Sequence, residues 1–221
     1  MKRHSPNTQT RCAFLLAALA LLGACAQGVR PSDDDRAQLA GQPAIHVLHY
    51  ETPLPRIKGG DNPTPAAVRR HAAADPAALI AQGFSRLLGK KEKLKNLRVE
   101  ARTQPQPVAK DTGRYREKYR RGLVLELWVD EWSFAPLTTG TKTYAMTLGA
   151  RSRLSRVEDG RVLWSTGRCS VDGNNGNREQ RLAGTELTSG TKLRKLLVAV
   201  RDECARQLLR DFDIRSGGGK K

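Results

Sequence analysis

The histidines and carboxylates of the chain are the first candidates for metal binding or acid–base chemistry. His46 and His49 are three residues apart, a spacing that brings two ligands together on a helix. They fall within residues 44–51, where apolar alternation predicts a strand, so their side chains point to opposite faces. Asp130 and Glu131 are adjacent on another expected strand and diverge in the same way, which leaves Asp130 to pair with a cross-strand arginine. Neither pair predicts a metal site or a catalytic dyad.

Motifs for nucleophiles and phosphate binding are equally weak. The chain contains no G-x-S-x-G segment around a serine. Residues 184–192 have five residues between their glycines where a phosphate loop has four, and a threonine precedes the lysine, so a helix cap is the better interpretation. We therefore expect a protein that is not an enzyme and has no cofactor or metal. An envelope hydrolase is the alternative, because catalytic side chains need not be adjacent in sequence.

Cys25 follows a segment that is typical of export. Positive charges precede an apolar run over residues 12–24, which is short for a bilayer span but suits the apolar region of a signal peptide. The run leads into Leu22-Gly23-Ala24-Cys25, which resembles the lipobox of bacterial lipoproteins. That resemblance implies cleavage between Ala24 and Cys25 and attachment of lipid to Cys25. Because Ala26 follows instead of Asp, it also implies the periplasmic face of the outer membrane.

The same residues allow a second interpretation. Ala24-Cys25-Ala26 fits the A-x-A pattern of ordinary signal cleavage, which would release a soluble periplasmic protein starting at Gln27. The cysteine directly after Leu-Gly-Ala is the sharper pattern, so lipidation is the interpretation that we favour.

Cys169 and Cys204 are the cysteines left in the mature chain once Cys12 is removed and Cys25 carries lipid. An oxidising compartment favours their pairing, and the alternative is two separate buried thiols. A bridge across 35 residues (204 − 169) would contribute roughly 3–4 kcal/mol through the unfolded state.

The chain is strongly basic. It has 221 residues and a net charge of +17, which becomes +14 (17 − 3) without Lys2, Arg3 and Arg11 of the signal segment. Export argues against nucleic acid as the partner and favours lipopolysaccharide, phospholipid head groups or acidic proteins. The plainer interpretation spreads the charge over solvated faces, where it only biases association.

Composition divides the chain into four parts. Residues 1–24 are the expected signal peptide, and residues 25–43 are a lipidated N-terminus and a small, polar tether. Residues 44–213 form a single expected domain, and residues 214–221 are a flexible basic tail.

Periodicity predicts two helices in the domain. Asp75 and Pro76 open the first, which has apolar residues on one face and ends at Gly89. Thr191 opens the second, which runs to about Phe212 and turns Cys204 inward.

Alternation predicts the strands. A strand at 97–101 follows the first helix, and residues 104–119 are expected to be a loop or mobile flap. Residues 122–170 show the densest alternation and predict an antiparallel three-stranded meander with a turn at Glu158-Asp159-Gly160. The expected fold is therefore a two-layer α+β domain, a mixed sheet containing this meander packed under the two helices.

Several local motifs carry a family resemblance. The signal segment, the His-Val-Leu-His-Tyr strand, Glu131-Trp132-Ser133-Phe134 and the hairpin over residues 158–164 together resemble a group of uncharacterised proteobacterial lipoproteins. The order of helices and strands is also similar to the small domain of TolB-like and ABC-transport auxiliary lipoproteins. These resemblances imply an envelope lipoprotein, or an accessory subunit of a transporter, and assign no catalytic residues.

Two surfaces are candidates for binding another envelope component. One is the basic segment over residues 110–121, with Lys118, Arg120 and Arg121, which suits an anionic partner. The other is the strand end with Trp132 and Phe134, which would be an apolar contact patch. The alternative is that these two side chains belong to the core, as most aromatic residues of such a meander do. The sequence therefore predicts a membrane-anchored protein with a binding or accessory role.

Overall fold

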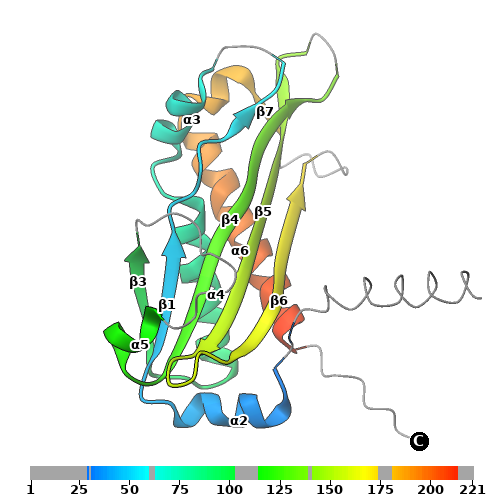
Figure 1. Ribbon diagram of the computed structural model, residues 1–221. Helices are drawn as coiled ribbons and strands as arrows, with labels where there is room; N and C mark the ends of the chain where they lie inside the picture. The colour runs from blue at the N-terminus through cyan, green and yellow to red at the C-terminus, as the bar shows by residue number, and fades with distance from the viewer. Residues whose placement is uncertain are drawn as a thin grey trace, which may run out of the picture.

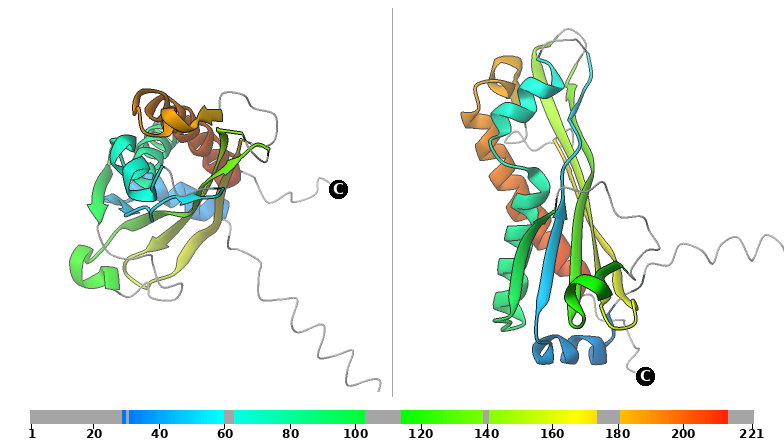
Figure 2. Two further views of the ribbon diagram at one scale, coloured as in Figure 1. Left: turned by 90° about the horizontal axis from the view of Figure 1, so that it is seen from above. Right: turned by 60° about the vertical axis from the view of Figure 1, so that its left-hand side comes forward.

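The structure is a computed structural model that describes residues 29, 31–59, 63–102, 114–138, 141–173 and 181–213. A sheet and a layer of helices make up its body (Figures 1 and 2). The helices are α2 (Asp33–Gly41), α3 (Pro65–Ala72), α4 (Pro76–Lys91), α5 (Arg114–Tyr119), the 3₁₀ helix η3 (Gly184–Leu187) and α6 (Thr191–Asp213). The strands are β1 (Ile45–Tyr50), β2 (Arg56–Ile57), β3 (Leu97–Arg102), β4 (Leu123–Pro136), β5 (Thr143–Arg156), β6 (Val162–Asp172) and β7 (Arg181–Ala183).

The sheet is mixed, as the sequence predicts. Its order is β3-β1-β4-β5-β6, and the two short strands β2 and β7 pair with β4 and β5. The β3, β1 and β4 strands are parallel to one another, whereas β4, β5 and β6 form the antiparallel meander. Gly160 has φ +70° in the turn between β5 and β6, which suits the glycine that the sequence places there. The expected α+β fold is confirmed.

The helices α4 and α6 cover one face of the sheet (Figure 2). Asp75 caps α4 by accepting hydrogen bonds from two backbone N–H groups of the first turn, and Pro76 occupies the first helical position. The helix runs two residues past the expected end at Gly89. Gly83 allows the close approach of α6, because a Cβ at this position would lie 2.9 Å from the Arg201 side chain.

A β-bulge reverses the expected exposure of Trp132 and Phe134. The register between β4 and β5 shifts between Val129 and Glu131, so one extra residue stands on β4. Odd-numbered side chains face α4 and α6 before the bulge, and even-numbered ones face them after it. Trp132 and Phe134 are therefore in the main core, 4% and 0% exposed, and the prediction of an apolar contact patch is wrong.

The predicted disulfide is present. Cys169 on β6 and Cys204 on α6 are bonded, and their Cα atoms are 5.0 Å apart. Both cysteines are fully buried. The bridge fastens the longest helix to the meander from inside the core.

The segment expected to be a tether differs from that expectation in its second half. Helix α2 begins there with a capping box. The Ser32 hydroxyl accepts a hydrogen bond from the Asp35 N–H, and the Asp35 carboxylate accepts one from the Ser32 N–H. Leu39 is buried in the main core. The folded domain therefore begins before residue 44, whereas the signal segment, Cys25 and the expected tail lie outside the described residues.

The expected flap over residues 104–119 also differs in part. Its last residues form α5, which lies on the sheet face opposite α4 and α6. Tyr115 is buried there against Leu48, Val124 and Val157 in a second, smaller apolar cluster. The rest of this segment, residues 104–113, lies outside the described residues. A further short helix, α3, was not predicted from the sequence.

Candidate functional site

A buried polar network lies on the sheet face that α5 covers. Glu126 on β4 accepts hydrogen bonds from the hydroxyls of Tyr50, at 2.5 Å, and Tyr115. Its other oxygen accepts from Arg153 Nε on the neighbouring strand at 2.7 Å, and neither charged side chain is more than 6% exposed. Burial and the negative charge of Glu126 raise the pKa of Tyr50 far above its ordinary value, so its hydroxyl remains a donor. This arrangement neutralises a buried charge and ties α5 to the sheet.

A second network holds α5 at its other end. Glu100 on β3 interacts with His46 Nδ1 at 2.7 Å, Lys118 Nζ at 3.0 Å and the Tyr119 hydroxyl at 2.8 Å. The rings of His46 and Tyr119 stack with centroids 3.9 Å apart. Burial raises the pKa of Glu100, but the three hydrogen bonds outweigh it and hold the pKa at about 2. Lys118, a predicted partner-binding residue, therefore also positions α5.

The two histidines of β1 are separated as the sequence predicts. His46 lies in the network of Glu100, whereas His49 is half-buried and its Nδ1 has no hydrogen-bond partner among the described residues. Burial lowers the pKa of His49, and the nearby Asp75 opposes that shift in part. Across the parts of the chain that the structure describes, no three His, Cys, Asp or Glu side chains are grouped to hold a metal ion. Asp130 pairs with Arg151 of β5 at 2.6 Å, which confirms the expected cross-strand ion pair.

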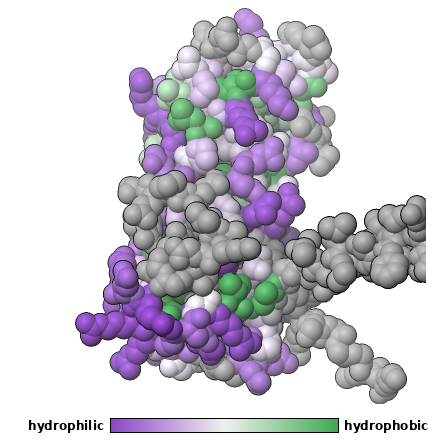
Figure 3. Space-filling view, viewed as in Figure 1, coloured by the Kyte–Doolittle hydropathy of each residue, from purple (hydrophilic) through white to green (hydrophobic). Residues whose placement is uncertain are grey.

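Arg120 and Arg121 belong to a larger basic surface, which we call the basic rim. It lies at the α2 end of the sheet, along the edge formed by β3, and Figure 3 shows hydrophilic residues gathered at that end. Its exposed side chains are Lys90, Lys93, Lys95, Arg98, Arg116, Arg120 and Arg121. Among the described residues, none of these seven has a carboxylate within 4.0 Å, in contrast to Lys118. The basic segment predicted from the sequence contains Arg116, Arg120 and Arg121. The other four members come from the end of α4, the turn after it and the start of β3.

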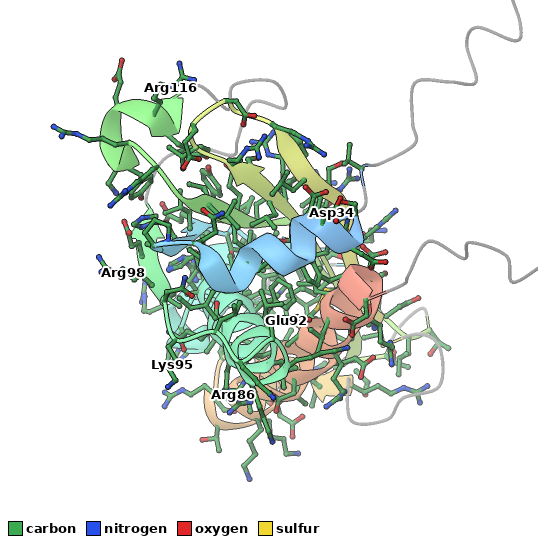
Figure 4. All side chains as sticks on the ribbon, turned by 90° about the horizontal axis from the view of Figure 1, so that it is seen from below. Asp34, Arg86, Glu92, Lys95, Arg98 and Arg116 are labelled. Carbon is green, nitrogen blue, oxygen red and sulfur yellow. A yellow bond between two sulfur atoms is a disulfide. The ribbon has the colours of Figure 1, made fainter. Side chains whose placement is uncertain are left out.

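Carboxylates neutralise only part of the basic rim. Glu92, Glu117 and Glu158 lie in the same turns and in α5, which leaves an excess of four positive charges (7 − 3). Figure 4, which views the molecule from below, shows Asp34 at the N-terminal end of α2. Lys95, Arg98 and Arg116 lie at the margin of the molecule near the C-terminal end of this helix. The C-terminal end of α2 therefore carries an excess of positive charge, whereas at its N-terminal end Asp35 pairs with Arg161 at 3.6 Å.

The N-terminal segment joins the domain at this same end. The Val29 N–H donates to Ser165 Oγ at 2.9 Å, and the Ser165 N–H donates to the Val29 carbonyl at 2.7 Å. These bonds fix Val29 against β6, and α2 then crosses the end of the sheet toward β1 (Figure 1). Cys25 and Ala24 precede Val29 by only four and five residues, outside the described part of the chain.

A cleft of about 930 Å³ opens at the opposite end of the sheet. It lies between the connection from β4 to β5, the segment after β2, and η3. Its described lining is rich in hydroxyl groups and includes Thr138, Thr141, Thr185, Thr188, Tyr144 and Lys142. The described lining contains no carboxylate or histidine, so it offers a polar surface without a candidate acid or base among those residues. The predicted helix-cap segment supplies its η3 wall, and nothing in the sequence predicted the cleft itself.

Comparisons with known proteins show likeness only at the level of overall structure. No protein-family model and no curated protein matches the chain. Three similar solved structures are a DUF330 protein of Xanthomonas campestris, PelC of Paraburkholderia phytofirmans, described as a dodecamer, and the lipoprotein GNA1162 of Neisseria meningitidis.

These likenesses are distant. The Xanthomonas protein is 12% identical with a TM-score of 0.37, covering 83% of this chain and 94% of its own. PelC is 17% identical with a TM-score of 0.29, covering 80% and 93%. The Neisseria lipoprotein is 18% identical with a TM-score of 0.29, covering 74% and 99%. Similarity of this degree carries no argument about function, and the resemblance to TolB-like proteins stays a prediction.

Proposed function

We propose that this chain is a lipid-anchored protein of the cell envelope whose domain binds another envelope component and has no catalytic role. The observation that carries the proposal is the position of Cys25. It ends the lipobox-like Leu22-Gly23-Ala24-Cys25 and lies four residues before Val29, the point at which the chain joins the domain. Four extended residues reach about 14 Å, so a lipid on Cys25 would hold the domain close to its membrane.

The non-catalytic part of the proposal rests on how the titratable groups are used. Glu126 is occupied by two tyrosines and Arg153, and Glu100 is occupied by three partners from β1 and α5. Both networks join secondary-structure elements, which is a structural role. Among its described lining residues, the cleft at the other end presents hydroxyl groups and no carboxylate or histidine to act as their base.

The binding role is assigned to the surface around α5. Arg120 and Arg121 are exposed and belong to the basic rim, and Lys118 stands beside them with 55% of its side chain exposed. An excess of exposed positive charge suits an anionic envelope component. The residue after Cys25 is alanine, and by resemblance to proteobacterial lipoproteins we assign the anchor to the periplasmic face of the outer membrane.

The anchor is tested by the mass of the mature N-terminus. Protein extracted from membranes with detergent should start at Cys25 and carry acyl chains, and Cys25→Ser should remain uncleaved or lose its lipid. A mature chain that starts at an unmodified Gln27 would show ordinary signal cleavage and end the proposal of a lipid anchor.

The binding role is tested by crosslinking a tagged chain in cells and identifying what is recovered. Arg120→Gln with Arg121→Gln should lower recovery of an anionic component at low salt, because the side chains stay polar but lose their positive charge. A matched control is Arg56→Gln with Arg168→Gln, two exposed arginines elsewhere on the surface. Equal recovery from both variants would remove the α5 surface as the binding site.

A further inference from the structure

The anchor and the basic rim lie at the same end of the molecule, on either side of α2. Val29 is held against β6 near the N-terminal end of this helix. At its other end, the Gln42 carbonyl accepts a hydrogen bond from Asn96, which directly follows Lys95 of the basic rim. The nine residues of α2 span about 13 Å, so the two features are separated by little more than the helix.

We propose that the α2 end of the domain lies against the membrane that holds Cys25 and that the basic rim binds anionic phospholipid head groups there. This inference rests on the proposed lipid anchor and names the anionic component that the rim binds. The reach of about 14 Å from Cys25 to Val29 leaves little room for this end to turn away from the membrane surface. The unneutralised cations at the far end of α2 supply a second attachment beside the lipid.

Because the lipid anchor already holds the protein at the membrane, a weak electrostatic contact between the basic rim and the head groups is enough to orient the domain. A site tethered by a few residues experiences an effective concentration on the order of millimolar, so the rim need not bind tightly by itself. Lysines and arginines close to an anionic lipid surface are each attracted to it within a Debye length. The rim therefore orients the domain, whereas the lipid keeps it on the membrane.

The acidic residues of this end determine which side makes the contact. Asp33 and Asp34 are exposed in the first turn of α2, at the end where the anchor enters. Arg161 of the adjoining turn pairs with Asp35 at 3.6 Å, so this end of α2 presents less unpaired positive charge than the basic rim. This difference favours contact of the rim with anionic lipid. The cleft then opens at the end of the domain that points away from the membrane (Figure 1).

Lysine labelling of the full mature lipoprotein tests the orientation. The protein is reconstituted in phosphatidylcholine vesicles with and without phosphatidylglycerol, treated briefly with an amine-reactive ester, and digested for mass spectrometry. Lys90, Lys93 and Lys95 report on the rim, and the control lysines at the other end are Lys58, Lys142 and Lys195. Phosphatidylglycerol should lower the labelling rate of the rim lysines by at least about threefold and leave the control lysines unchanged.

Two variants that lose equal charge test whether the protection of Lys90 depends on the positive charge of the basic rim. The rim variant carries Lys93→Gln, Lys95→Gln, Arg98→Gln and Arg121→Gln, and Lys90 should lose its protection in it. The control variant carries Lys58→Gln, Lys195→Gln, Arg56→Gln and Arg168→Gln, four exposed positions away from the rim, and should keep that protection. Both variants lose the same number of charges.

Three other results would contradict the docking of the rim, the lipid anchor or the choice of lipid as the partner. Equal labelling of rim and control lysines on both vesicles, with the lipid present on Cys25, would overturn the docking inference and leave the anchor intact. An unmodified start at Gln27 would instead overturn the proposed function itself. Protection of rim lysines in isolated envelopes but not on phosphatidylglycerol vesicles would assign the rim to an acidic protein and overturn the lipid assignment.

Discussion

Two arginines of β5 occupy very different environments although they are two residues apart. Arg153 pairs with Glu126 and both side chains are buried, whereas Arg151 pairs with Asp130 and its side chain is 53% exposed. We expect Arg153→Met to lower the free energy of unfolding by about 3–5 kcal/mol, because it leaves a buried carboxylate without its counter-charge. Arg151→Met should cost about 1 kcal/mol or less. Urea unfolding measures both, and equal losses would contradict the assignment of Glu126 to the interior.

Glu100 predicts a defined loss of stability in acid. Its pKa in the folded protein is about 2, below the ordinary value of 4.5, because of its three hydrogen-bond donors. A lowered pKa contributes stability above pH 4.5 that is lost as the pH falls toward 2. Glu100→Gln should therefore flatten the pH dependence of urea unfolding in this window. Glu117→Gln, an exposed glutamate of α5, is the control, and a similar flattening in that variant would contradict the prediction.

The sequence predicted the environment of single residues correctly where that environment follows from the local pattern of the chain. Strand alternation separated His46 from His49, and compartment and helical spacing predicted the pairing of Cys169 with Cys204. It failed for Trp132 and Phe134, because their exposure depends on the bulge at Asp130, and a bulge shifts the alternation by one residue. The two polar networks were also missed, since hydrogen-bonded partners in them lie up to 76 residues apart and carry no motif.

At the scale of elements, the disulfide between β6 and α6 is the main covalent constraint. It closes a loop of 35 residues between two buried cysteines. We expect the variant with Cys169→Ala and Cys204→Ala to lose about 3–4 kcal/mol of unfolding free energy, because its unfolded chain is no longer restricted. Equilibrium urea unfolding with and without dithiothreitol measures the loss. The reductant should destabilise the wild type and leave the double variant unchanged, and a reductant effect of equal size in both would contradict this role.

The elements that the sequence predicted are those with long periodic patterns. The meander, α4 and α6 each present an apolar face over many residues, so their burial follows from the pattern. Helices α2 and α5 were missed because they are short and polar. Each is held by a few tertiary contacts, Leu39 in the core for α2 and Tyr115 against the sheet for α5, which no local pattern reveals.

At the scale of the whole molecule, the two ends of the sheet have different chemistry. The α2 end has the chain entry and the basic rim, and the opposite end has the hydroxyl-lined cleft. A domain anchored at the first end presents the second to whatever partner approaches from the periplasm. Under the proposed docking, the strong positive charge of the chain would contribute to orientation at the membrane.

High salt should weaken the contact between the basic rim and the membrane but leave the lipid anchor in place. Raising the salt concentration from about 0.1 M to about 1 M shortens the Debye length from roughly 10 Å to 3 Å, which weakens attraction of the basic rim to head groups but not burial of acyl chains. On vesicles with phosphatidylglycerol, the labelling rate of Lys93 and Lys95 should therefore rise to that of Lys195, while the protein still floats with the vesicles. Release of the protein at high salt would mean that charge alone holds it. Persistent protection of Lys93 and Lys95 at high salt would mean that these lysines are covered by something other than an electrostatic contact.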